Sequence, residues 1–164
     1  MTSGPAEDPI RRTPVQRVVL LLRLRRWRQS ATMSCFVSHT SIDCRNAYEL
    51  SEWWKPVLDY VDLEGDPNLP GHEECIIRDA RTGHRILFIE VPEEKTVKNR
   101  VHFDLRPREG SRDEEVARLR EHGATVVADL RGRHGPGSGW VVFADPEGNE
   151  FCVLRSEAEQ AASG

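Results

Sequence analysis

The sequence of 164 residues lacks long apolar runs and has few aromatic side chains. Aromatic residues make up 7% of it, and its longest aliphatic run, Val18 to Leu22, is far shorter than the roughly 20 residues of a membrane-spanning helix. Hydrophobic residues at 38% and charged residues at 30% are an ordinary globular balance, and the length suits one domain with one core. We therefore expect a single soluble domain with no membrane partner.

Cysteine is scarce, and its spacing gives no metal or disulfide signal. Cys35, Cys44, Cys75 and Cys152 form no CxxC pair and none of the spacings typical of zinc ligands. The sequence also has no segment that resembles an efficient secretory signal. Reduced thiols and a cytoplasmic location are the expectation that follows.

Excess positive charge is absent from most of the chain. The net charge is -4, yet residues 1–32 carry seven arginines against Glu7 and Asp8, so the remainder is strongly acidic. Binding to nucleic acid through its phosphates needs clustered Lys and Arg. We therefore expect no nucleic-acid partner for the folded part.

The basic N-terminal extension, residues 1–32, stands apart from the rest in composition. As a secretory or twin-arginine signal it fails, because arginines at positions 23, 25 and 26 interrupt the apolar run. We interpret it as disordered or as a start-site artefact, with natural translation beginning at Met33. A basic amphipathic helix on an anionic membrane surface is the alternative interpretation.

Two motifs of common enzyme classes are missing. The sequence has no GxSxG elbow, which argues against a hydrolase of that type. The glycine-rich segment RGRHGPGSG, residues 131–139, lacks the GK[ST] ending of a phosphate-binding loop and does not lead into a helix. We interpret it as a flexible loop, from which Arg133 and His134 could approach an anionic ligand.

What the sequence does contain is one pattern repeated: a strand, a helix and three short strands over residues 35–91, then again over residues 99–155. In the first copy, Asn46 is a helix N-cap and Pro56 should kink or end the last turn. In the second, Ser111 and Glu114 form a capping box and Gly123 closes the helix. Each unit alone has too small a core, so the pattern predicts that the two pack together.

The order of these elements, with HTSIDCRNAYELSEWW, KTVKNRVHFDLRP and GWVVFADPEGNEFCVL, resembles the vicinal oxygen chelate superfamily and in particular its glyoxalase-like domains. The resemblance implies an α+β fold in which two βαβββ modules form curled sheets around a cup that holds a small-molecule site. The DPEGN segment is then the turn before the last cup strand. We place the domain at residues 33–156 and a flexible C-terminal tail at residues 157–164.

Strand alternation indicates which side chains face such a cup. The more apolar sides, with Thr40, Ile42 and Cys44 in one strand and Val101, Phe103 and Leu105 in the other, should meet the helices. This turns His39 and Asp43 of the first strand, and Arg100, His102 and Asp104 of the second, toward the cup. Cys152 joins them if Phe151 and Val153 face the helix. Trp140 adjoins Gly139 and is a candidate for the ligand wall, although alternation leaves open which face of its strand is inward. A half-solvated sheet face is the other interpretation of the same pattern.

The resemblance also implies where a divalent metal would be held, at one place on the first and last strand of each module. These places fall on His39, Glu90, Arg100 and Cys152. Arginine cannot ligate a metal because its guanidinium stays protonated and has no free lone pair. We therefore expect no cofactor, the alternative being a rearranged metal set in which His102 takes the place of Arg100.

Three functions remain open at the level of sequence. The preferred one is binding of a small organic molecule in the cup, with metal-independent acid or base chemistry from the histidines and aspartates. The second is a metal-dependent lyase, isomerase or dioxygenase of the same superfamily. The third is a ligand-free interaction module, and a homodimer is compatible with each of them.

Overall fold

The computed structural model describes residues 35–162 of the chain. Its contacts divide the chain into two units, Met1–Val37 and Ser38–Gly164, and the fold described here is that of the second. The predicted extension over residues 1–32 and the predicted start at Met33 lie outside the described residues. Among the described residues, no helix has the length and apolarity needed to cross a membrane.

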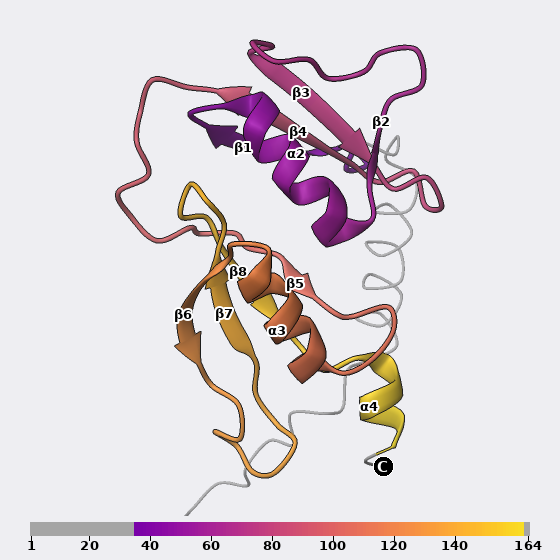
Figure 1. Cartoon of the computed structure of the whole chain (residues 1–164), viewed down its shortest axis with the longest axis vertical. Helices are drawn as coiled ribbons and strands as arrows, with labels where there is room; N and C mark the ends of the chain where they lie inside the picture. The colour runs from indigo at the N-terminus through magenta and orange to yellow at the C-terminus, as the bar shows by residue number, and fades with distance from the viewer. Residues whose placement is uncertain (1–34, 163–164) are drawn as a thin grey trace, which may run out of the picture. The chain divides into compact units, whose positions relative to one another are not determined.

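Each half of the second unit contains one sheet of four strands and one helix between its first two strands, and a short helix, α4 (Glu157–Ala161), follows the second sheet (Figure 1). The first half comprises β1 (Thr40–Cys44), α2 (Ala47–Leu58), β2 (Val61–Asp62), β3 (Glu74–Arg78) and β4 (Arg85–Glu90). The second half comprises β5 (Asp104–Leu105), α3 (Arg112–Glu121), β6 (Thr125–Asp129), β7 (Val141–Ala144) and β8 (Glu150–Val153). The sheet orders are β1-β4-β3-β2 and β5-β8-β7-β6, with the first strand of each half parallel to its last. The predicted α+β fold of two βαβββ modules is confirmed, with open sheets.

Helix α2 begins and ends where the sequence predicts. The Asn46 side chain accepts a hydrogen bond from the backbone N–H of Glu49, and the helix ends two residues after Pro56. Asp59 then adopts the left-handed conformation with φ 57°. The apolar stripe of α2 packs on β3 and β4, and Figure 1 shows this helix lying across the first sheet.

Aromatic rings from both halves meet in a shared core. Trp54 of α2 is 1% exposed, and its ring lies 5.0 Å from that of Phe151 on β8 and 5.8 Å from that of Phe103. Phe151 in turn stacks on Phe143 of β7 at 5.7 Å. Phe151 therefore contacts α2, and Val153 is buried in the same core. Cys152, which alternates with them along β8, projects from the opposite face of the sheet.

The DPEGN turn, residues 145–149, joins the two halves. Asp145 is buried and accepts a hydrogen bond of 3.1 Å from the Trp54 indole. The two carboxylate oxygens of Glu147 accept from the backbone N–H groups of Arg45 and Asn46 at 2.6 and 3.0 Å, where α2 begins. A carboxylate at a helix N-terminus satisfies free N–H groups and opposes the positive end of the helix dipole. This turn of the second half therefore caps the helix of the first.

Two predicted strands are shorter than expected. The opening strand of the second half was predicted over residues 100–105, but β5 contains only Asp104–Leu105, because only these residues pair with β8. The expectation that Val101 meets the helix is wrong, since Val101 lies outside the ladder and is 80% exposed. In the first half, pairing with β4 begins at Thr40, so His39 precedes β1.

The structure also adds a helix at the C-terminal end of the domain and moves the cap of α3 by one residue. Residues 157–161, predicted as part of a flexible tail, form α4 (Glu157–Ala161), because Ser156 and Glu159 make a reciprocal capping box. Glu159 also accepts a hydrogen bond from the backbone N–H of Arg112 at the start of α3. At the other end of α3 the cap residue is His122, and Gly123 follows it with φ 99°.

Candidate functional site

The site is built around a hollow beside the edge strand β1. It has a volume of about 580 Å³, within the range of small-molecule pockets. We call it the β1 hollow. It is lined by β1 residues 40–43, Trp54, residues 91, 93–95 and 97–103 of the connection between the halves, and residues 149–150.

Three of the predicted site residues, Asp43, Arg100 and His102, line the β1 hollow. Its wall also contains Lys95, whose ammonium lies 3.1 Å from the Glu150 carboxylate. Arg100 forms no ion pair or side-chain hydrogen bond with any residue that the structure describes. The hollow therefore combines one neutralised ion pair with a free guanidinium and an imidazole.

His102, Asp104 and Cys152 form a cluster at the junction of β5 and β8. Nε2 of His102 lies 3.5 Å from Oδ1 of Asp104, and one potential donor atom from each of the three residues lies within 4.8 Å of the others. The cluster forms because Asp104 is the direct partner of Cys152 in the parallel ladder. Parallel neighbours project their side chains from the same face of a sheet.

The thiol of Cys152 is held in its protonated form. Burial raises its pKa to about 11, with the charge and hydrogen bond of Asp104 adding to the rise, while the Lys98 ammonium opposes it. A thiol with such a pKa is a weak nucleophile near neutral pH, because the thiolate is the reactive form. The cluster therefore offers an imidazole and a carboxylate for chemistry, with a neutral thiol beside them.

Replacing Asp104 with asparagine is expected to make Cys152 more reactive. The substitution removes a charge that raises the pKa of Cys152, so the thiolate fraction at pH 9 should rise, and with it the rate of alkylation by iodoacetamide by several fold. In the unmodified protein the rate should keep increasing as the pH approaches 11. Peptide mass spectrometry separates this signal from that of exposed Cys35. An unchanged rate at Cys152 would mean that Asp104 does not act on the thiol.

The cluster is chemically suited to a divalent metal. Imidazole nitrogen, carboxylate oxygen and thiolate sulfur are all zinc ligands, and three donors so close together could converge on one ion. A bound cation would also favour the Cys152 thiolate. The structure does not assemble the rearranged set considered above: Glu90 accepts a hydrogen bond from the Ala47 N–H at the start of α2, and the His39 ring contacts Ser38. The cluster shares His102 and Cys152 with the rearranged set, but its third member is Asp104 and it contains neither Glu90 nor His39.

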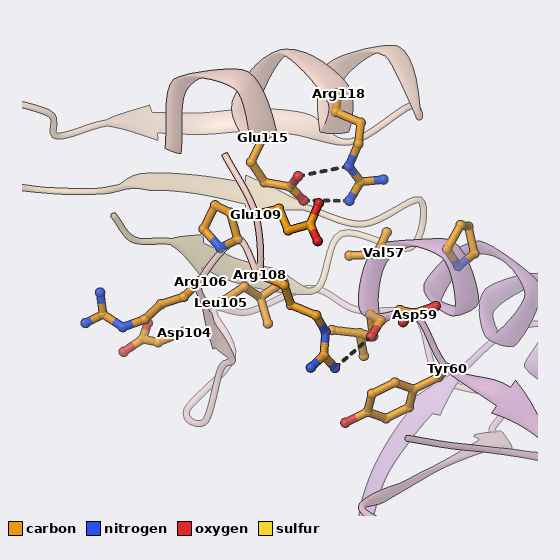
Figure 2. A pocket seen from close by; sticks show the side chains of 13 residues that line it. Val57, Asp59, Tyr60, Asp104, Leu105, Arg106, Arg108, Glu109, Glu115 and Arg118 are labelled. Carbon is orange, nitrogen blue, oxygen red and sulfur yellow. Dashed lines mark hydrogen bonds and ion pairs between the residues drawn. The ribbon is translucent and has the colours of Figure 1, made fainter. Parts of the chain in front are cut away.

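A second hollow of about 550 Å³ lies between the C-terminal end of α2 and the segment that follows β5. Figure 2 shows Asp104 and Arg106 on one side of it and Tyr60 and Asp59 on the other. Arg108 donates to the Leu58 carbonyl at 3.4 Å and also lies 3.2 Å from the Asp79 carboxylate. Glu115 and Arg118 pair with each other on α3 (Figure 2). Arg108 therefore joins the second half to the first, whereas the Glu115–Arg118 pair lies within the second half.

Three predicted site residues, His39, Trp140 and Cys152, line neither hollow, and of these only Cys152 belongs to the cluster with His102 and Asp104. His39 is exposed ahead of β1, and Trp140 precedes β7. The structure shows which face of its strand Trp140 shares. Val141 and Phe143 are fully buried in the core, so Trp140 and Val142 project from the other face. Val142 is the ladder partner of Cys152. Trp140 thus lies on the sheet face of Cys152 but does not line either hollow.

Several wall residues were not among the predicted ones, above all Lys98 and two exposed valines, Val97 and Val101. For Lys98, but not for the two valines, a signal was present in the sequence. The segment KNRVH places cations at positions 98 and 100 and a histidine at position 102, at intervals of two residues. That spacing puts all three on one side of an extended chain.

Comparison with known proteins agrees with the geometry. The glyoxalase-like domain family matches residues 39–154. No curated protein matches the sequence. A possible glyoxalase from Bacillus cereus superposes with a TM-score of 0.53 at 15% identity, covering 74% of this chain and 99% of that one. The fosfomycin resistance protein FosX from Mesorhizobium loti gives 0.53 at 14% identity, covering 79% and 99%. A FosX variant from Listeria monocytogenes, complexed with Mn(II) and 1S,2S-dihydroxypropylphosphonic acid, gives 0.55 at 16% identity, covering 78% and 95%.

Proposed function

This chain belongs to the glyoxalase-like domain family of the vicinal oxygen chelate superfamily, and from that premise we propose that it binds a small organic molecule in the β1 hollow and performs acid or base chemistry on it through His102. One observation carries the proposal: the wall of a hollow of about 580 Å³ contains an imidazole that lies 3.5 Å from a carboxylate. Fold alone does not assign chemistry, so the site has to support it.

The chemistry follows from the arrangement of the pair. Asp104 lies beside Nε2 of His102, so it orients the ring. The other ring nitrogen, Nδ1, is then the one that takes a proton from a bound molecule and later returns it. Imidazole suits this role because one ring nitrogen can accept a proton while the other donates a hydrogen bond. The reaction class is proton transfer at a carbon made acidic by a neighbouring carbonyl or similar group.

Binding and chemistry can be tested by separate variants. We expect compounds that bind to stabilise the protein against heat, by about 2.7 kcal/mol at a hundredfold excess over the dissociation constant. Ser41 is exposed and lines the hollow, so Ser41→Trp should fill it and abolish the shift, whereas Ser41→Ala should keep it. A compound that stabilises the Ser41→Trp protein equally well binds elsewhere.

His102→Gln tests the acid or base role. It should keep the thermal shift of a bound carbonyl compound and lose roughly a hundredfold or more of the rate at which that compound's α-proton exchanges in deuterated water, measured by NMR. Arg133→Gln is the control, because Arg133 is exposed in the loop over residues 131–139. Exchange at the unmodified rate in His102→Gln would contradict the proposal.

A metal-dependent enzyme is the second candidate, favoured by the cluster of His102, Asp104 and Cys152. These residues would hold a divalent ion, which would supply Lewis-acid stabilisation of a developing negative charge. Related folds bear on this candidate, since a FosX variant has been solved with Mn(II). Elemental analysis of purified, untagged protein decides between the two: stoichiometric metal that is lost in Cys152→Ala supports the enzyme, and metal-free protein with full ligand binding supports the first proposal.

A further inference from the structure

Charge is unevenly distributed around the β1 hollow. Glu93 and Glu94 lie at the start of the connecting segment, whereas Lys98 and Arg100 lie further along it, next to His102. The only ion pair among the described wall residues is the one between Lys95 and Glu150. Asp43 of β1 also lines the hollow, so the wall contains carboxylates as well as cations, and Lys98 and Arg100 are its two cations without an ion pair to any described residue.

These two cations are available to a ligand. Within the part of the chain that the structure describes, neither Lys98 nor Arg100 forms an ion pair or a side-chain hydrogen bond. The ammonium of Lys98 is close enough to Cys152 to act on it electrostatically, so it also lies near the cluster that contains His102. A cation without a counter-charge on the wall of a hollow favours an anionic group there.

The rest of the wall near these cations is apolar. Val97 and Val101 flank Lys98 and Arg100 in sequence and are 76% and 80% exposed. Phe103 also lines the hollow, together with Trp54, which is 1% exposed. Large exposed apolar side chains gathered at one place commonly mark a binding surface. An occupant would thus contact hydrocarbon on its body and cations at one end.

We propose that the ligand of the β1 hollow is an organic oxyanion with an apolar body, its anionic group held between Lys98 and Arg100 and its apolar part against Val97, Val101 and Phe103. The inference rests on the proposed function and specifies its ligand class. Arg100 can bind carboxylate or phosphonate through two parallel hydrogen bonds, while Lys98 acts as a point charge.

A set of probes that share a phenyl ring and carry an anionic, neutral or cationic polar group tests the ligand class. Phenylacetate, phenylphosphonate, phenylacetamide and phenethylamine share the aromatic body, and isothermal titration at millimolar concentration measures each. We expect the two anions to bind at least roughly tenfold more tightly than the amide or the amine, in line with charge-assisted hydrogen bonds. Comparison of the two anions then distinguishes carboxylate from phosphonate ligands.

Charge-neutral variants test the residues. Lys98→Gln and Arg100→Gln should each weaken binding of the preferred anion by roughly tenfold, with little effect on phenylacetamide. Arg133→Gln removes the same charge from a segment that does not line the hollow and should leave binding unchanged. Equal losses of anion affinity in all three variants would mean that binding depends only on the net charge of the protein, which would overturn the inference.

The outcomes separate this inference from the proposed function. If phenylacetamide or phenethylamine binds as tightly as the anions, and Ser41→Trp abolishes that binding, the hollow takes small molecules but the oxyanion class is wrong. If none of the four probes binds, the proposed function fails together with the inference. If the anions bind with the expected preference but Lys98→Gln and Arg100→Gln bind them normally, the assignment to this pair is wrong.

Discussion

Gly139→Ala is expected to destabilise the protein by about 3 to 5 kcal/mol, because the substitution combines a backbone penalty with an overpacked contact. Gly139 has φ 78°, and a Cβ atom there would lie 1.9 Å from the Leu130 carbonyl oxygen. The obstruction is backbone, so it cannot be relieved by turning a side chain. Arg112 also holds this point through a hydrogen bond of 2.7 Å to the Gly139 carbonyl. Chemical denaturation followed by circular dichroism measures the loss.

Gly132→Ala is the matched control. Gly132 lies in the same loop with φ 74°, but nothing lies within 4 Å of the position of its Cβ. Its substitution should cost only the left-handed backbone term, about 1 to 2 kcal/mol. Equal losses in the two variants would mean that the close approach to Leu130 contributes nothing. A stable Gly139→Ala protein would show that the loop has another arrangement.

The fold was predictable because its signals are local and repeated. The capping residues Asn46 and Ser111 each satisfy a backbone N–H three residues along the chain, so they can be read from a short window. The repetition of one strand and helix order then fixes which strands share a sheet. By contrast, the length of β5 depends on where β8 lies, and its pairing at only Asp104 and Leu105 is not visible in either segment alone.

The candidate site was predictable only where alternation applied. His102, Asp104 and Cys152 come together as strand faces and the repeat implied. His39 does not join them because it precedes the first ladder pair. Lys98 was missed because its importance comes from a fold-dependent hollow and from its proximity to Cys152, which is more than fifty residues away in sequence.

The DPEGN turn shows how a short motif can act at long range, and Asp145→Ala is expected to cost about 3 to 4 kcal/mol. Oδ1 of Asp145 accepts hydrogen bonds from the backbone N–H groups of Glu147 and Asn149, and Oδ2 accepts from the Trp54 indole at 3.1 Å. Alanine would leave the buried indole N–H unpaired and release the turn that places Glu147 at the start of α2. Thermal and urea unfolding measure the loss.

A double-mutant cycle separates the indole contact from the rest of the turn. Asp145→Asn keeps one carbonyl oxygen but presents an amide to the network, so its loss should fall below that of Asp145→Ala. Trp54→Phe removes the indole N–H, and in the Asp145→Asn protein it should cost less than in the unmodified protein by about 1 to 2 kcal/mol. Trp53→Phe is the control, because its N–H donates to the His122 carbonyl and should add independently of Asp145. Strict additivity between Trp54→Phe and Asp145→Asn would show that the indole hydrogen bond does not contribute to stability, and that the other contacts between the halves, among them ring packing against Phe151 and the Glu147 cap, hold them together.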